Sequence, residues 1–205
     1  YVVAMDKRTG KTVWKVERSM LKEGANEIRL EKSGSRPVYF SVDATFFSLE
    51  EPIAAAGNEL FVRRRYDRWK GKQTLLKGIQ YEPELVNDKG RVKSGERVLA
   101  TLTLESKTDQ EYLLIEDLKP AGLEAVQIQS GQPLYAREIN PKTKLPTGRN
   151  AWVYQELRDR KVALFIDKLP QGLWELSYDL RAEAPGEFHA LPTLGQAMYI
   201  PEIRG

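Results

Sequence analysis

The sequence of 205 residues contains no cysteine and only one histidine. Without cysteine the chain has no disulfide, no thiol nucleophile and no cysteine-bound zinc site. The cellular compartment stays open, because a periplasmic protein does not need disulfides and a cytosolic protein rarely has them.

Long apolar runs and a large excess of one charge are also missing. No stretch reaches the roughly 18 apolar residues that a membrane-spanning helix requires. Lys and Arg number 32 against 29 Asp and Glu, which gives a formal net charge of +3. A nucleic-acid-binding protein usually concentrates a basic excess on one face. We therefore expect no nucleic-acid partner and no membrane contact from this chain.

Alternation of apolar and polar residues is the dominant pattern that is present. It recurs in three runs, which are Val38 to Phe46, Val98 to Glu105 and Trp174 to Glu183. Turns that carry Gly or Pro separate these runs, and no stretch has a convincing helical period. Strands of this kind bury one face and leave the other in water. The predicted fold class is all-β, an antiparallel β-sandwich with a second, partial β domain.

The domain boundary is predicted near Glu51 to Asn58, where a proline, an alanine triplet and a glycine interrupt the strand pattern. Residues 1–57 then form the partial β domain, with about four strands. That is too few to close a sandwich, so we expect this domain to be truncated or completed elsewhere in a longer parent chain. Residues 58–205 form one complete sandwich of about seven strands.

Some element predictions can be checked individually. In the first domain, the later strands are predicted at Asn26 to Glu31 and Pro37 to Phe47. In the second domain, the polar segment Gln127 to Arg149 contains three prolines and is predicted to be a surface loop.

The most basic segment runs from Arg63 to Lys72 and interleaves cations with aromatic rings. Such a segment can grip phosphates while it stacks bases. The same composition is typical of an edge strand that enters a hairpin, with a charged solvent face that resists edge-to-edge pairing. The balanced overall charge favours the edge strand. As a surface for a protein partner, the candidate residues are Arg63, Arg64, Arg65, Arg68 and Trp69.

Catalytic and metal-binding arrangements are weak in this sequence. A catalytic triad is disfavoured, because Ser177 lies on the expected wet face of a strand and has no nucleophile-elbow glycines around it. His189, the only histidine, is expected between the strand residues Phe188 and Ala190, where a structural role is more common. Adjacent strand residues point to opposite faces, so Glu116 and Asp117 cannot both line one site. Asp159 and Asp167 flank a strand at its turns, and no calcium-loop spacing is present. We predict a chain that is not an enzyme, with no metal site and no cofactor.

The segment near the end of the chain places Met198 and Tyr199 side by side. If this segment is a strand, the two side chains face opposite ways and one of them should lie in the core. The other then needs a second surface to cover it. The alternative is that both pack within the domain.

Several sequence blocks resemble a known family. They are Gly24 to Ile28, Val38 to Phe40, Leu60 to Tyr66, Glu116 to Leu123, Leu157 to Val162, Leu169 to Tyr178, Arg181 with Ala182, Pro185 to Phe188, Pro192 and Met198 to Glu202. In this order they resemble the C-terminal region of bacterial alpha-2-macroglobulins, meaning the last macroglobulin domain and the linker domain before it. The resemblance covers nearly the whole chain and implies a macroglobulin or fibronectin-III-like β-sandwich.

The resemblance implies a part in a periplasmic protease trap, whose parent protein is often lipid-anchored. In that family a protease cleaves a bait region, and an activated thioester on another domain then couples to the attacker. The expected partners are the thioester domain of the same parent chain and, through the parent, proteases. Met198 and Tyr199 match the place of residues that shield the thioester. The alternative function is a fibronectin-like adhesion or protein-binding module.

Overall fold

The computed structural model describes residues 3–5, 12–15, 17–22, 24–27, 29, 54–74, 78–126 and 133–205. The chain divides into two compact units, Tyr1–Pro52 and Ile53–Gly205. The domain bounds 1–57 and 58–205 stay a prediction.

The first unit contains a small antiparallel ladder. Strand β1 (Val3–Met5) pairs with β2 (Thr12–Lys15), and a short 3-10 helix, η1 (Arg18–Met20), follows. The described residues of the predicted strand Asn26 to Glu31 have no regular structure. The predicted strand Pro37 to Phe47 lies outside the described residues.

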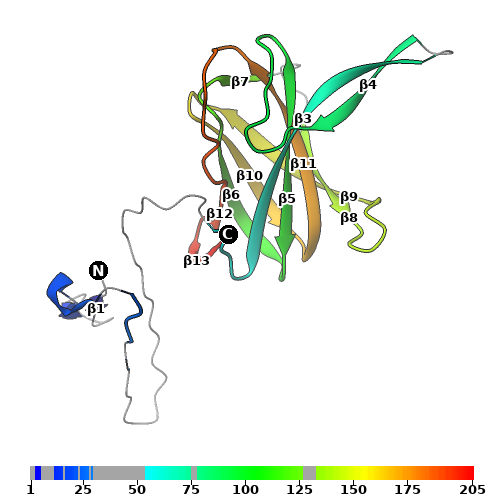
Figure 1. Ribbon diagram of the computed structural model, residues 1–205. Helices are drawn as coiled ribbons and strands as arrows, with labels where there is room; N and C mark the ends of the chain where they lie inside the picture. The colour runs from blue at the N-terminus through cyan, green and yellow to red at the C-terminus, as the bar shows by residue number, and fades with distance from the viewer. Residues whose placement is uncertain are drawn as a thin grey trace. The chain divides into compact units, whose positions relative to one another are not determined.

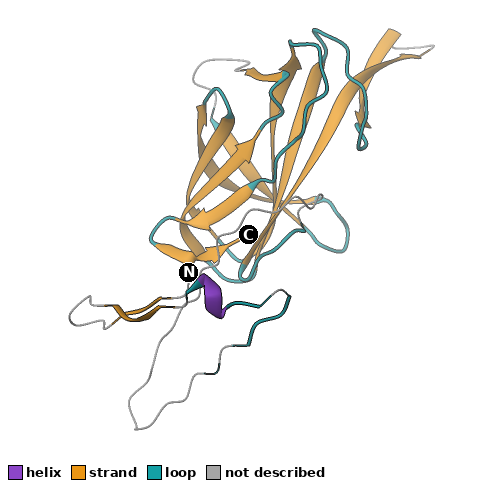
Figure 2. Cartoon of the chain, turned by 60° about the vertical axis from the view of Figure 1, so that its left-hand side comes forward, coloured by secondary structure: helices purple, strands orange, loops and turns teal. Residues whose placement is uncertain are grey.

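The second unit is built from strands, and Figure 2 shows that its regular structure contains no helix among the described residues. Eleven strands belong to one hydrogen-bonded sheet in this part of the chain, and every pairing is antiparallel. The all-β antiparallel fold is therefore confirmed. The strands are β3 (Leu60–Thr74), β4 (Gly78–Leu85), β5 (Arg97–Ser106), β6 (Gln110–Leu118), β7 (Leu123–Val126), β8 (Leu134–Ile139), β9 (Pro146–Leu157), β10 (Lys161–Leu169), β11 (Gly172–Ala182), β12 (Leu194–Ala197) and β13 (Ile200–Arg204).

The sheet folds over on itself at β9. The first part of β9 pairs with β8, as in Leu134 with Val153, and its last part pairs with β10, as in Tyr154 with Phe165. The spatial order is β13-β12-β6-β10-β9-β8-β11-β5-β3-β4, and β7 pairs with β11 beside this path. The strands β3, β5 and β11 thus form one half of the sandwich, while β6, β10 and β12 form the other (Figure 1).

The hydrophobic core lies between the two halves. On β5 and β11 the buried residues face each other across the ladder, as in Leu104 with Trp174 and Leu102 with Leu176. They join buried residues of β6 and β10, such as Ile115 and Leu164, in one hydrophobic cluster. Each large apolar side chain buried in this way stabilises the fold by about 1.5–3 kcal/mol. The period-two alternation of Val98 to Glu105 and of Trp174 to Glu183 is the source of this core.

Two sequence predictions were wrong in this unit. The sandwich has more strands than the about seven expected from the sequence. The segment Gln127 to Arg149 is not one loop, because its described part, from residue 133 onward, contains β8 and the start of β9. These two strands pair through a hairpin whose turn is held by hydrogen bonds from Lys142 and Thr143 to the side chain of Asn140. Prolines at the ends of these strands do not interrupt the ladder.

The hairpin of β3 and β4 extends beyond the rest of the sandwich (Figure 1). Its strand partners Trp69 with Pro83 and Gly71 with Tyr81 lie on one face. The opposite face carries ion pairs, such as those of Lys70 with Glu84 and Lys72 with Glu82. The predicted hairpin is therefore present, but β4 rather than β3 is the edge strand.

Candidate functional site

Met198 and Tyr199 lie together at the tip of the hairpin that β12 and β13 form. Ala197 pairs with Ile200, so Met198 and Tyr199 make up the turn between the strands. Met198 is 46% exposed and Tyr199 is 75% exposed. The prediction that one of them lies in the core was wrong, because a turn does not force alternate side chains to opposite faces. Both side chains are presented to solvent.

Two further exposed apolar side chains lie beside this turn. Ile200 follows the turn on β13 and is exposed, and so is Tyr112, which comes from β6. We call these four residues, Tyr112, Met198, Tyr199 and Ile200, the apolar tip. Single exposed apolar side chains are normal on a protein surface, but a contiguous group points to a site of interaction.

Contacts with β6 fix the position of the turn. The backbone N–H of Met198 donates a hydrogen bond of 2.9 Å to the carbonyl oxygen of Tyr112. The rings of Tyr112 and Tyr199 meet edge to face, with centroids 5.2 Å apart and planes at 86°. Edge-to-face aromatic pairs are favoured by the ring quadrupoles and contribute about 0.5–1.5 kcal/mol. The apolar tip is therefore an ordered surface.

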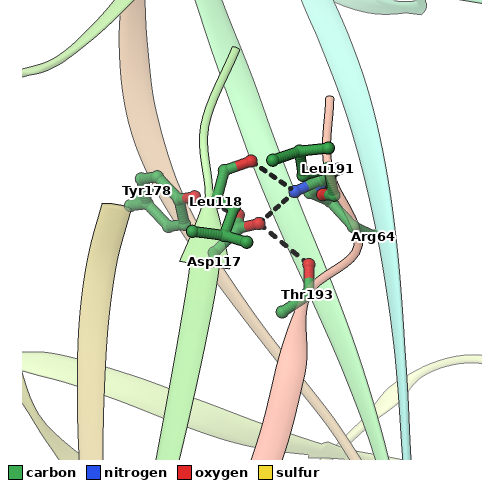
Figure 3. A network of polar contacts seen from close by, with 6 residues as sticks. All are labelled: Arg64, Asp117, Leu118, Tyr178, Leu191 and Thr193. Atoms are coloured by element: carbon green, nitrogen blue, oxygen red, sulfur yellow. Dashed lines mark hydrogen bonds and ion pairs between the residues drawn. The ribbon is translucent and has the colours of Figure 1, made fainter. Parts of the chain in front are cut away.

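A buried polar network lies inside the sandwich near this hairpin (Figure 3). Asp117 of β6 has 0% of its surface exposed and accepts hydrogen bonds from three side chains. These donors are Nη1 of Arg64, the hydroxyl of Tyr178, and Oγ1 of Thr193 at 2.8 Å. The Arg64 side chain is only 11% exposed and also lies against the ring of Tyr66, 4.9 Å from its centroid. A buried charge is tolerated only when it is paired in this way.

The pKa values of Tyr178 and Tyr66 are both raised, by burial first and then by the charge of Asp117. Burial is the first cause for Tyr178, followed by the charge of Asp117 and the hydrogen bond to it. Burial is also the first cause for Tyr66, with the charge of Asp117 second. In both residues the neutral hydroxyl is favoured, because a phenolate would lose its hydration and face a carboxylate.

The network also anchors the segment that leads into the β12–β13 hairpin. Nη2 of Arg64 donates to the carbonyl oxygen of Leu191 at 2.7 Å, and Thr193 contacts Asp117 directly. Arg64 and Asp117 come from β3 and β6, which belong to opposite halves of the sandwich. The network thus ties both halves to the segment that precedes the apolar tip.

The structure separates the candidate partner-binding residues of the basic segment. The side chains of Arg63 and Arg65 are largely exposed, whereas Arg64 belongs to the buried network. Arg68 forms an ion pair with Glu84 across the hairpin. Trp69 is exposed on the face of the hairpin that also carries Tyr81. The five candidate side chains therefore do not form one surface.

The other sequence candidates lie apart from one another. Asp117 is buried while Glu116 pairs with Lys161 on the other side of β6, as the sequence predicts for adjacent strand residues. His189 was expected between strand residues, but it lies in the irregular segment between β11 and β12. Among the described residues, no three His, Cys, Asp or Glu side chains gather as metal ligands. No helix in the described part is long and apolar enough to cross a membrane.

The fold and the site together define an all-β domain that presents an apolar hairpin tip. Comparison with protein families identifies the domain: residues 60–202 match the bacterial alpha-2-macroglobulin MG10 domain. The chain belongs to this family, as the sequence resemblance indicates. Membership of this family of protease inhibitors also confirms the prediction that the chain is not an enzyme.

Individual relatives agree with this family. An alpha-2-macroglobulin of Xylella fastidiosa (strain Temecula1) is 24% identical over 88% of this chain and 10% of its own length. That of Thermotoga maritima is 30% identical over 68% of this chain and 10% of its own length. The chain thus spans about a tenth of these curated relatives. A solved structure of Escherichia coli alpha-2-macroglobulin activated by porcine elastase is 20% identical over 76% of this chain and 13% of that chain, with a TM-score of 0.48.

Proposed function

We propose that this chain is part of a periplasmic bacterial alpha-2-macroglobulin that traps proteases, in which it docks on the thioester domain of the same protein. Met198 and Tyr199 are the thioester-shielding residues. The observation that carries the proposal is their joint exposure at an ordered hairpin tip. An apolar tip that protrudes from a domain is suited to cover a reactive group on its neighbour.

The chemistry of a thioester suits this role. A thioester persists only where water and amines are excluded. The polarisable side chain of Met adapts to an irregular surface, and a Tyr ring supplies a large apolar area. Burying each of them against a partner is favourable by up to about 1.5–3 kcal/mol.

The test uses the full-length protein and its reaction with methylamine. Attack of methylamine on the thioester releases a thiol, whose appearance gives the rate. Tyr199→Ala and Met198→Ala should accelerate this release, because each removes part of the cover. Tyr135→Ala is the matched control, since Tyr135 is also an exposed tyrosine but lies on β8. Two tip variants that release thiol at the wild-type rate would rule out the shielding role.

The protease partners are tested separately. Elastase, which activates the Escherichia coli relative, is a suitable attacking protease. The full-length wild-type protein should become covalently linked to elastase. In the Tyr199→Ala variant, water should hydrolyse part of the thioester first, so less elastase should become linked. Equal linkage by both proteins after long storage would contradict the proposal.

A second candidate function rests on the β3–β4 hairpin. One face of this hairpin exposes Trp69, Ile79, Tyr81 and Leu85 and fits an adhesion or protein-binding module, with Arg63 and Arg65 exposed beside it on β3. Replacing Ile79 and Tyr81 by Ser should then abolish attachment of the full-length protein to a cell surface and leave thiol release unchanged. Attachment that survives this double change, and also Arg63→Glu with Arg65→Glu, would eliminate the candidate.

A further inference from the structure

Tyr112 contacts the shielding turn at two points although it lies on a different strand. Its carbonyl oxygen accepts the backbone N–H of Met198 at 2.9 Å, and its ring meets the ring of Tyr199 edge to face at 5.2 Å. The first contact fixes the start of the turn. The second fixes the direction of the exposed ring.

The backbone of Tyr112 is unusual for its place in the fold. Its φ is 53°, in the left-handed region that residues other than glycine rarely adopt. Among described residues other than glycine, positive φ is shared only by Lys89 and Lys144, which lie outside strands, whereas Tyr112 lies inside β6. Backbone strain that persists within a regular element is characteristic of functional sites.

The pattern of buried and exposed residues in β6 changes at Tyr112. Its alternation breaks here, because Glu111 and Tyr112 are both exposed before the buried residue Leu113. The partner strand β10 breaks its alternation at the paired position, where Asp167 and Lys168 are both exposed. Tyr112 is 47% exposed as a result, beside the turn rather than in the core.

We propose that Tyr112 is a positioning residue, which holds the ring of Tyr199 in the orientation that covers the thioester; this rests on the function proposed above. A tyrosine at the tip of a turn would otherwise sample several rotamers. A ring that is already held loses less conformational entropy when its partner surface covers it. Tyr112 thus acts through Tyr199.

The test is thiol release by methylamine in the full-length protein. Tyr112→Asn removes the ring but tolerates the left-handed backbone, so it separates the two features of this residue. It should accelerate thiol release roughly two- to tenfold, the range expected for loss of one edge-to-face contact. Tyr112→Phe keeps the ring, so this variant should release thiol at the wild-type rate. Tyr135→Asn is the matched control, because Tyr135 is similarly exposed on β8.

A purely structural role predicts a different pattern. It would lower the thermal midpoint of Tyr112→Asn and leave the rate of the folded protein unchanged. Because the proposed effect passes through Tyr199, the double variant with Tyr199→Ala should react no faster than Tyr199→Ala alone. If the Asn variant does not fold, Tyr112→Leu provides the same comparison with apolar bulk retained, and it should also accelerate thiol release.

The outcomes distinguish this proposal from the one on which it rests. If Tyr199→Ala accelerates thiol release but Tyr112→Asn and Tyr112→Leu do not, the positioning role is wrong and the shield stands. Additive effects of Tyr112→Asn and Tyr199→Ala would also overturn the positioning role. If Tyr199→Ala has no effect, the positioning role fails. If Met198→Ala has no effect either, the shielding function fails as well.

Discussion

Removal of the buried carboxylate of Asp117 should be among the most destabilising single changes in this domain. Asp117→Ala leaves the guanidinium of Arg64, which is 11% exposed, without its counter-charge. It also leaves the hydroxyls of Tyr178 and Thr193 without their acceptor. Breaking a buried ion pair by removing one partner typically costs about 3–5 kcal/mol. For a chain of this size the melting temperature should fall by roughly 6–20 °C.

The assay is urea unfolding followed by tryptophan fluorescence, to which the buried Trp174 contributes. A slope of about 1–3 kcal/mol per molar urea converts the expected loss into a midpoint lower by about 1 M or more. Glu116→Ala is the matched control, because this neighbour pairs with Lys161 at a partly exposed position. Its removal should cost less than about 1 kcal/mol.

A second variant tests the cause of the loss. Adding Arg64→Met to Asp117→Ala removes the charge that was left unpaired, so part of the lost stability should return. The reasoning is refuted if Asp117→Ala destabilises the chain no more than Glu116→Ala does. It is also refuted if the double variant is as unstable as the sum of the two single variants.

The pKa of Tyr66 and the pKa of Tyr178 are raised, first by burial and then by Asp117, so both residues keep their protons in the folded chain at pH values where an unfolded chain has lost them. The free energy of unfolding should therefore not depend on these two tyrosines below a pH of about 10, and it should fall above that pH by about 1.4 kcal/mol per pH unit for each of them. A spectroscopic titration in which every tyrosine of the folded chain ionises near a pH of about 10 would contradict this. Gly195→Ala should cost about 1–3 kcal/mol in urea unfolding, because the new Cβ would lie 2.8 Å from Cγ2 of Val62, and an unchanged midpoint would show that the core yields there. Arg158→Ala removes the ion pair with Glu156, in which the Arg158 side chain is half exposed, and urea unfolding should find no change in stability.

The fold was largely predictable because alternation is a local property. The buried residues Val98, Ala100 and Leu102 were identified by their phase, and so was the buried face of the Trp174 run. Asp117 is in phase with the buried residues Leu113 and Ile115, a signal that places this carboxylate inside the sandwich.

Arg64 of β3 shows what the sequence pattern does not predict. It is in phase with Leu60 and Val62, which face the core, yet a run of three arginines reads as a solvated surface. No pattern along one strand states that an arginine on β3 will meet an aspartate on β6. The loop predicted for residues 127–149 failed for a related reason, since pairing with neighbouring strands outweighs the local preference of a polar, proline-containing segment.

The sequence by itself determined the fold class, the absence of cysteine chemistry and the resemblance to a macroglobulin domain. Each of these depends on composition, on period-two alternation or on blocks of residues in order. The tertiary structure decided that Met198 and Tyr199 occupy a turn and are both exposed, and that Tyr112 supports them. Turn position, left-handed backbone and contacts between strands arise only when distant segments pair. They are therefore properties of the assembled sheet rather than of any one stretch of chain.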